Sequence, residues 1–154
     1  MKEKTCCFTG HREIEDADKD TLKAALDAAI RDLIARGYRY FGAGGALGFD
    51  TLAASAVLSL KKEYPDIALI LVLPCPNQTR YWKSEDVAAY EEIMRRADKC
   101  VYTSDHYFNG CMQKRNRYLV DHSSACIAYL RRESGGTAYT VEYAKAQGVA
   151  VKNI

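Results

Sequence analysis

The sequence lacks several features that would assign it to a function class at once. It has no C-x-x-C pair, and its 3 histidines are scattered, which argues against a structural zinc site or any other metal site. It contains no Walker A motif, no Ser/His/Asp arrangement and no carboxylate pair at metal-binding spacing. No apolar run approaches the roughly 20 residues of a transmembrane helix, so we expect no membrane partner.

An excess of charge of one sign is also missing. The chain has 22 basic and 20 acidic residues and a net charge of +2, a balance that makes a nucleic-acid partner unlikely. Its 154 residues, 48% of them hydrophobic, are typical of one globular domain spanning residues 1–154.

The six cysteines would favour disulfides in a small secreted chain, but no signal peptide precedes them. Four of them lie in apparent strands, where a reduced cysteine behaves as a small hydrophobic residue. We therefore expect a reducing, cytoplasmic setting.

Strand-like and helix-like segments alternate along the whole chain. Short β-prone runs are predicted at residues 5–9, 38–42, 67–73, 100–103, 125–130 and 149–151. The segments between them have helical spacing, and Asp18 or Asp20 is placed to cap the first helix. This alternation predicts an α/β fold with an open parallel sheet, in which ligands bind beyond the carboxyl ends of the strands.

The most informative stretch is GAGGALGFDTLAA, residues 42–54, which links the second strand to the second helix. Its glycines permit close approach of a ligand, and Asp50 stands where a helix N-cap belongs. Such a helix start suits a phosphate or another anion; the alternative is a tight turn with no ligand. The dinucleotide fingerprint is not met, because its third glycine falls at Leu47, so a nicotinamide dehydrogenase is unlikely.

Other loops at the same predicted sheet edge hold candidate ligand-binding residues. Arg12 can bind a phosphate or carboxylate through two N–H groups, and Arg115 stands in the first turns of a basic helix. Trp82, if exposed, or Tyr81 can stack on a base. Glu142 follows a second glycine turn at residues 134–137. For each residue an ordinary structural or solvent-exposed role is the alternative.

Together these loops resemble the SLOG superfamily, specifically its YpsA/YoqJ-like branch. The matching segments are CCFTGHR (6–12), GALGFDTLAA (45–54), LPCPNQ (73–78) with Trp82, GCMQKRNRYLVDHS (110–123) and SGGTAYTVEYA (134–144). The resemblance implies a Rossmann-like three-layer α/β/α sandwich with a mostly parallel sheet of about six strands. It also implies a homo-oligomer that binds a nucleotide or nucleotide-derived ligand, as a sensor or accessory protein, without a cofactor.

Two relatives of that family supply alternatives. Residues 112–116 are similar to the M-H-x-R-K motif of the LOG-type phosphoribohydrolases, and their P-G-G-x-G-T-x-x-E motif places a catalytic glutamate at Glu142 beside Arg115. Ser134, Ala138 and Tyr139 depart from that motif. The turn at residues 44–50 is similar to one in the DNA-processing protein DprA, which implies single-stranded DNA binding as a less favoured function.

The sequence thus predicts one ligand site at the carboxyl edge of the sheet. Its catalytic residues, if it is an N-glycosidic hydrolase, are Glu142 and Arg115. Its expected ligand-binding residues are Thr9, Gly10, His11, Arg12, Gly44, Gly45, Gly48, Asp50, Thr51, Asn77, Gln78, Trp82, Arg115, Asn116, Gly135, Gly136 and Thr137.

Overall fold

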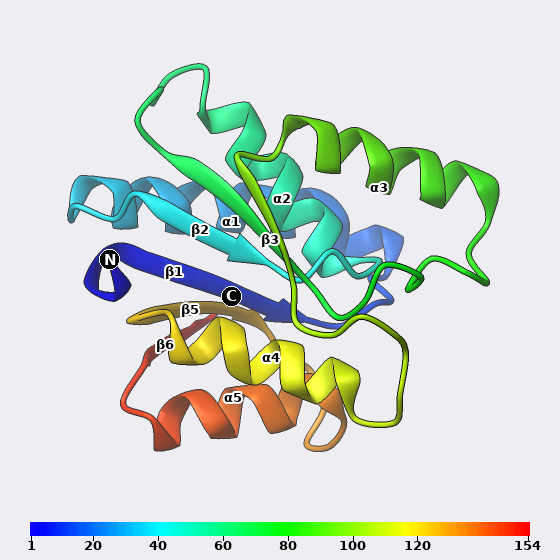
Figure 1. Cartoon of the computed structure of the whole chain (residues 1–154). Helices are drawn as coiled ribbons and strands as arrows, with labels where there is room; N and C mark the ends of the chain where they lie inside the picture. Colours follow the sequence, from blue (N-terminus) through cyan, green and yellow to red (C-terminus); the bar gives the residue numbers. More distant parts are fainter.

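The computed structural model describes residues 1–154, in which strands and helices alternate after a short 3-10 turn, η1 (Lys2–Lys4) (Figure 1). The strands are β1 (Thr5–Gly10), β2 (Tyr40–Ala43), β3 (Ala68–Leu73), β4 (Lys99–Tyr102), β5 (Ala125–Tyr129) and β6 (Ala150–Asn153). The helices are α1 (Asp16–Ala35), α2 (Phe49–Leu60), α3 (Ser84–Arg96), α4 (Cys111–Asp121) and α5 (Gly136–Ala146).

All six strands form one parallel sheet in the order β4-β3-β2-β1-β5-β6. The predicted α/β fold, Rossmann-like with six strands, is therefore confirmed. The chain moves outward from β1 to β4 and then returns to β5 on the other side of β1. This reversal of strand order lies between β1 and β5, and it is the place where open α/β sheets bind their ligands.

The helices form two layers on opposite faces of the sheet (Figure 1). Helices α1, α2 and α3 cover one face over a cluster of 24 buried residues, and α4 and α5 cover the other over a cluster of 7. Strand β1 serves both clusters, because successive side chains of a strand point to opposite faces: Cys6 and Phe8 join the larger cluster and Cys7 the smaller. β1 is thus the central strand of the fold.

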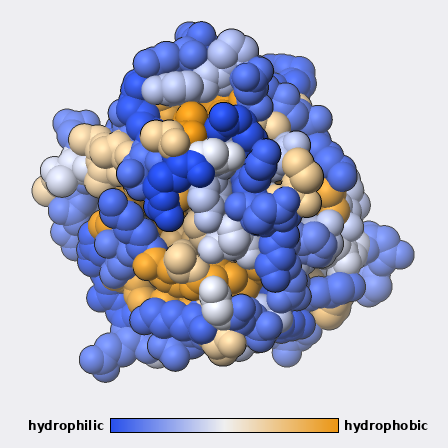
Figure 2. Space-filling model, turned by 90° about the vertical axis from the view of Figure 1, so that its left-hand side faces the viewer, coloured by the Kyte–Doolittle hydropathy of each residue, from blue (hydrophilic) through white to orange (hydrophobic).

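All six cysteines are free thiols, five of them buried. The surface at the amino ends of the strands is mainly hydrophilic, with hydrophobic residues showing only in patches between polar ones (Figure 2). None of the helices combines the length and the apolar character that crossing a membrane requires.

Two predicted helix starts are wrong. Helix α1 begins at Asp16 with Glu15 as its N-cap, before Asp18 and Asp20. Helix α2 begins at Phe49 with Gly48 as its N-cap, so Asp50 is the second helical residue and makes no capping bond. The reason is the backbone of Gly48, whose φ of 76° only glycine adopts readily, so that the helix begins two residues earlier than predicted.

Candidate functional site

A cavity of about 400 Å³ opens at the carboxyl edge of the sheet, beside the reversal of strand order between β1 and β5. We call it the polar cavity, because only 3 of its 16 lining residues are hydrophobic. Its lining comprises Phe8, Thr9, Gly10, His11, Arg12, Glu13, Ala46, Asp50, Met112, Arg115, Asn116, Arg132, Ser134, Gly135, Gly136 and Thr137. Four loop regions that lie far apart in the sequence therefore converge on one space.

The loop after β1 is held against the start of α2 by close backbone packing. Phe49 N–H donates to the carbonyl of His11 over 3.1 Å. A Cβ at Gly48 would lie 2.0 Å from the carbonyl oxygen of Arg12, so only glycine permits this approach. Gly48 thus fixes the backbone from which Arg12 and Glu13 project, although it does not itself line the cavity.

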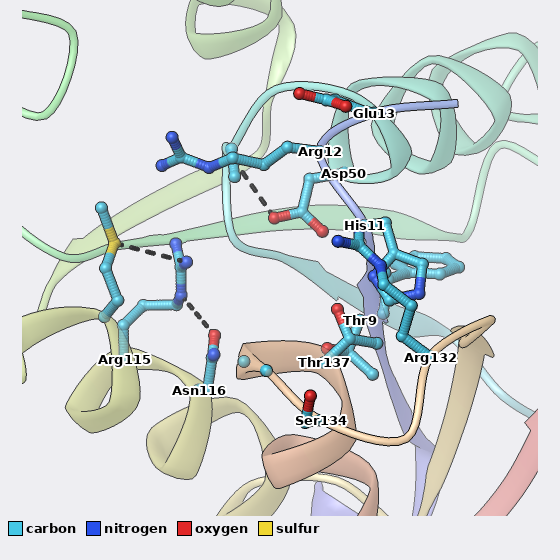
Figure 3. A pocket seen from close by; sticks show the side chains of 16 residues that line it. Thr9, His11, Arg12, Glu13, Asp50, Arg115, Asn116, Arg132, Ser134 and Thr137 are labelled. Atoms are coloured by element: carbon cyan, nitrogen blue, oxygen red, sulfur yellow. Dashed lines mark hydrogen bonds between the residues drawn. The ribbon is translucent and has the colours of Figure 1, made fainter. Parts of the chain in front are cut away.

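Arg115 forms a buried wall of the polar cavity, with only 4% of its surface exposed. Its Nε donates to Asn116 Oδ1 over 2.7 Å, its Nη1 donates to the carbonyl of Gly44, and its Nη2 donates to Met112 Sδ over 3.7 Å (Figure 3). No carboxylate lies within salt-bridge distance of this guanidinium. Since a guanidinium has five N–H donors, two remain for another acceptor.

Asp50 is the other buried charge of the polar cavity, with 7% of its surface exposed. Its Oδ2 accepts a bond from Ala46 N–H over 3.2 Å, which closes the turn before α2. Figure 3 shows its carboxylate pointing into the cavity, with Arg12 and Arg115 on one side and Arg132 on the other. The cavity therefore presents three guanidinium groups against the carboxylates of Asp50 and Glu13.

Burial dominates the ionisation of both buried groups. It raises the pKa of Asp50, an effect opposed by the positive charges of Arg115 and Arg12 and by the Ala46 N–H bond. It lowers the pKa of Arg115, and there the negative charge of Asp50 opposes the shift. Attraction between the two does not offset desolvation for either, as expected of opposite charges that share a site without touching.

The start of α5 completes the polar cavity opposite α4. Gly135, with a φ of 105°, is the N-cap, and Gly136 and Thr137 begin the helix. No side chain caps these residues, so the free N–H groups and positive dipole end face the cavity that they line. Exposed Arg132 precedes this turn at the rim.

His11 is buried in the wall of the cavity as a neutral imidazole. Its Nε2 accepts a bond from Arg131 N–H over 2.8 Å, and its ring lies edge-on to Tyr129. Burial, followed by the charges of Arg132 and Arg131, lowers its pKa. Because Nε2 is the acceptor, the proton of the neutral ring lies on Nδ1.

A second space of about 710 Å³ adjoins the polar cavity, and the two share Arg12 and Met112. We call it the aromatic hollow; 5 of its 11 lining residues are hydrophobic. The lining comprises Arg12, Leu47, Asn77, Gln78, Arg80, Tyr81, Trp82, Lys83, Asp86, Tyr107 and Met112.

The structure gathers most, but not all, of the residues that the sequence singles out. The polar cavity receives Thr9, Gly10, His11, Arg12, Asp50, Arg115, Asn116, Gly135, Gly136 and Thr137. The aromatic hollow receives Asn77, Gln78 and Trp82. Neither space is lined by Gly44, Gly45, Gly48, Thr51 or Glu142.

These exceptions have physical reasons. Gly44 and Gly45 lie against side chains of the protein itself, and Thr51 Oγ1 donates to the carbonyl of Ala46 over 3.1 Å. Glu142 is exposed on α5, six residues and therefore about 9 Å along the helix beyond Gly136. Its predicted catalytic position is not supported, because it does not face the cavity.

Sequence reasoning overlooked Glu13, Met112 and Arg132, which all line the polar cavity. Glu13 directly follows the His11-Arg12 pair, and Arg132 follows β5 before the glycine turn. The rule that ligands bind beyond the carboxyl ends of parallel strands, applied to the whole of each loop, would have included Glu13 and Arg132.

Comparison with known proteins finds a matching family and relatives with similar sequences. Residues 6–153 match the model of the YspA SLOG family. The SPbeta prophage-derived protein YoqJ of Bacillus subtilis is 33% identical over 137 residues, covering 80% of each chain. A UPF0398 protein of Oceanobacillus iheyensis is 28% identical over 146 residues, covering 88% of this chain and 79% of its own.

A solved structure shares the fold. DNA processing protein A from Helicobacter pylori, described as binding single-stranded DNA, has a TM-score of 0.67 and 18% sequence identity. The match covers 96% of this chain but only 63% of the other protein. At this identity the likeness concerns the fold alone.

Proposed function

The chain belongs to the SLOG family, in its YpsA/YoqJ-like branch, and we propose that it binds a nucleotide or nucleotide-derived ligand whose phosphate occupies the polar cavity. One observation carries the proposal: Arg115 is buried without a carboxylate contact and keeps two N–H donors free. A buried charge is costly unless it is paired. A phosphate meets the planar fork of a guanidinium bidentately.

The rest of the polar cavity supports the same ligand. The start of α5 offers unbonded N–H groups and a positive dipole end, and Arg12 and Arg132 add exposed positive charge at the rim. Thr9, Asn116 and Asp50 offer polar groups for the hydroxyls of a sugar. A role as a sensor or accessory protein agrees with a site that binds and holds its ligand.

Binding is tested by a thermal-shift screen against nucleotides, ADP-ribose, NAD and cyclic dinucleotides. A ligand at about 100 times its Kd adds roughly 2.7 kcal/mol to stability, which raises the melting temperature by about 5–10 °C in a domain of this size. The Kd of each hit is then measured for the wild type and for Arg132→Gln, which should weaken binding by up to about fivefold, because an exposed ion pair contributes about 0.2–1 kcal/mol.

Arg117→Gln is the matched control, since Arg117 lies outside the cavity and donates instead to Tyr139. The proposal would be contradicted if no compound raised the melting temperature, or if Arg132→Gln and Arg117→Gln lost equal affinity for the ligand. Homo-oligomerisation stays a prediction, which light scattering on the purified chain tests directly.

Single-stranded nucleic acid is a second candidate ligand. It is favoured by the fold shared with DNA processing protein A and by two exposed tyrosines near Arg80 and Lys83 in the aromatic hollow. It is ranked lower because the net charge is only +2. A fluorescent oligothymidine titrated at low salt tests it: the candidate requires binding whose affinity falls steeply as salt is added.

Hydrolysis of an N-glycosidic bond is not favoured by the geometry. The glutamate that the LOG-type motif supplies, Glu142, is exposed and outside both spaces. Hydrolysis therefore ranks below simple binding.

A further inference from the structure

We propose that the aromatic hollow is a nucleobase subsite, in which the base of the bound nucleotide stacks on Tyr81 and Tyr107. The inference rests on the proposed function, which places the phosphate in the neighbouring polar cavity. It goes further by naming the part of the ligand that the second space recognises and the side chains that recognise it.

The first support is the exposure of the two tyrosines. Tyr81 is 85% exposed and Tyr107 is 61% exposed, and they come from different loops, after β3 and after β4, yet line the same space. The Arg80 guanidinium lies 5.2 Å from the centre of the Tyr81 ring. Exposed rings beside cations, inside a concave space, are the usual platform for stacking a base.

The second support is the contrast between the two adjoining spaces. Hydrophobic residues are 3 of 16 in the lining of the polar cavity but 5 of 11 in the aromatic hollow. A nucleotide has the same division, with a charged sugar-phosphate half and a flat ring. Because Arg12 and Met112 line both spaces, the two spaces are neighbours, and the proposal assigns one half of the ligand to each.

The third support is Gln78, one of the lining residues of the aromatic hollow. Gln78 is 8% exposed, and its Nε2 donates to the Tyr90 hydroxyl over 3.1 Å, while its Oε1 is buried without any partner. Such an orphaned buried acceptor is rare in folded proteins. A base whose amino group drew this side chain toward the hollow would supply the missing donor.

Trp82 has a supporting role in this arrangement. Its ring meets that of Tyr90 edge-on, with the ring centres 5.4 Å apart, and it packs against the main core. The more exposed Tyr81 is therefore better placed than Trp82 to offer a ring face to a ligand.

The experiment compares ligands with and without a base. Affinities are measured by calorimetry for ribose 5-phosphate and for AMP, GMP, CMP and UMP. We expect at least one nucleotide to bind about 5- to 150-fold more tightly than ribose 5-phosphate, the range of a stacked base. In a Tyr81→Ala/Tyr107→Ala variant this ratio should fall toward one, while the affinity for ribose 5-phosphate stays unchanged.

Tyr139→Ala is the control, because Tyr139 is 42% exposed on α5 and lines neither space. The substituted tyrosines are exposed, so we expect the variants to fold, which their thermal unfolding verifies. If nucleotides and ribose 5-phosphate bind equally, or the double variant keeps the ratio, the inference is overturned and the proposed function survives. If none of the five compounds binds, the same comparison is made between a hit of the thermal-shift screen and its counterpart without a base. If that screen has no hit either, the proposed function fails together with the inference.

Discussion

Arg115 and Asp50 face each other across Gly44 without forming a salt bridge. A Cβ at Gly44 would lie 2.6 Å from Arg115 Nη1 and 2.8 Å from Asp50 Oδ2, so the absence of a side chain at this position leaves room for both charged groups. Both are buried, and burial raises the pKa of Asp50 and lowers the pKa of Arg115, which favours the neutral form of each group. The protein thus keeps two opposite charges close together yet unpaired, which leaves both available to a ligand.

Replacement of Gly44 by alanine should disrupt this arrangement. The new methyl group needs Arg115 or Asp50 to move in a buried site, and overpacking of this kind costs about 1–3 kcal/mol. Urea denaturation of the variant measures that loss. Gly136→Ala is the control: nothing lies within 4 Å of its Cβ position, so its stability should be unchanged or slightly higher. Equal stability of Gly44→Ala and the wild type would contradict the packing described here.

The two charges should also be energetically coupled. Arg115→Met leaves the Gly44 carbonyl and Asn116 Oδ1 without their donor and removes the stronger of the two positive charges that act on Asp50, so it should destabilise the fold by about 1–3 kcal/mol. Asp50→Asn keeps an oxygen for the Ala46 N–H. In the double variant this substitution should recover part of the loss, with a coupling of about 0.5–3 kcal/mol. Additive effects in a double-mutant cycle would show that the charges do not interact.

Much of this architecture could be predicted from the sequence. The alternation of strands and helices predicts the parallel sheet, and the strand-end rule predicts that Arg12, Arg115 and the turn at residues 135–137 meet. These predictions depend on the chain path alone, which local patterns describe well.

Side-chain direction is what the sequence does not reveal. Gly48 and Asp50 both stand at the start of α2, but a φ of 76° at Gly48 makes the glycine the cap and sends Asp50 into the cavity. Glu142 matches a catalytic motif by spacing, yet its helical turn points it to solvent. Such outcomes depend on where each helix begins and how it is rotated against the sheet, which is decided by tertiary packing.

His11 should make stability depend on pH. Its folded-state pKa is lowered by burial and by Arg132 and Arg131, so below the ordinary value of about 6.5 the unfolded chain binds a proton more readily than the folded one. Stability is therefore fully present above about pH 6.5 and decreases as the pH falls through that value. Protonation also removes the Nε2 acceptor for Arg131 N–H.

A His11→Gln variant isolates this contribution. Glutamine can still accept a bond from Arg131 N–H but does not titrate, so the difference in stability between wild type and variant should change between about pH 7 and pH 5. Urea denaturation at several pH values gives this difference. NMR titration of the His11 ring gives its pKa directly, and a value above 6.5 would reverse the expected slope.

Glu142 offers a direct test of whether the cavity or the motif identifies the functional carboxylate. Because Glu142 is exposed and lines neither space, Glu142→Gln should leave the affinity for a bound nucleotide within about twofold of the wild type, a difference under about 0.5 kcal/mol. Asp50→Asn, which alters a buried group inside the polar cavity, should change that affinity severalfold. Calorimetry with the same nucleotide on both variants makes the comparison.

The opposite ranking would have a specific meaning. Loss of binding in Glu142→Gln but not in Asp50→Asn would place the ligand over the outer face of α5, where the LOG-type motif rather than the cavity describes the site. Release of free base by the wild type and not by Glu142→Gln would identify Glu142 as a catalytic residue of an N-glycosidic hydrolase. The buried position of Asp50 and its Ala46 N–H bond favour the cavity, since a carboxylate held in this way keeps its geometry before any ligand arrives.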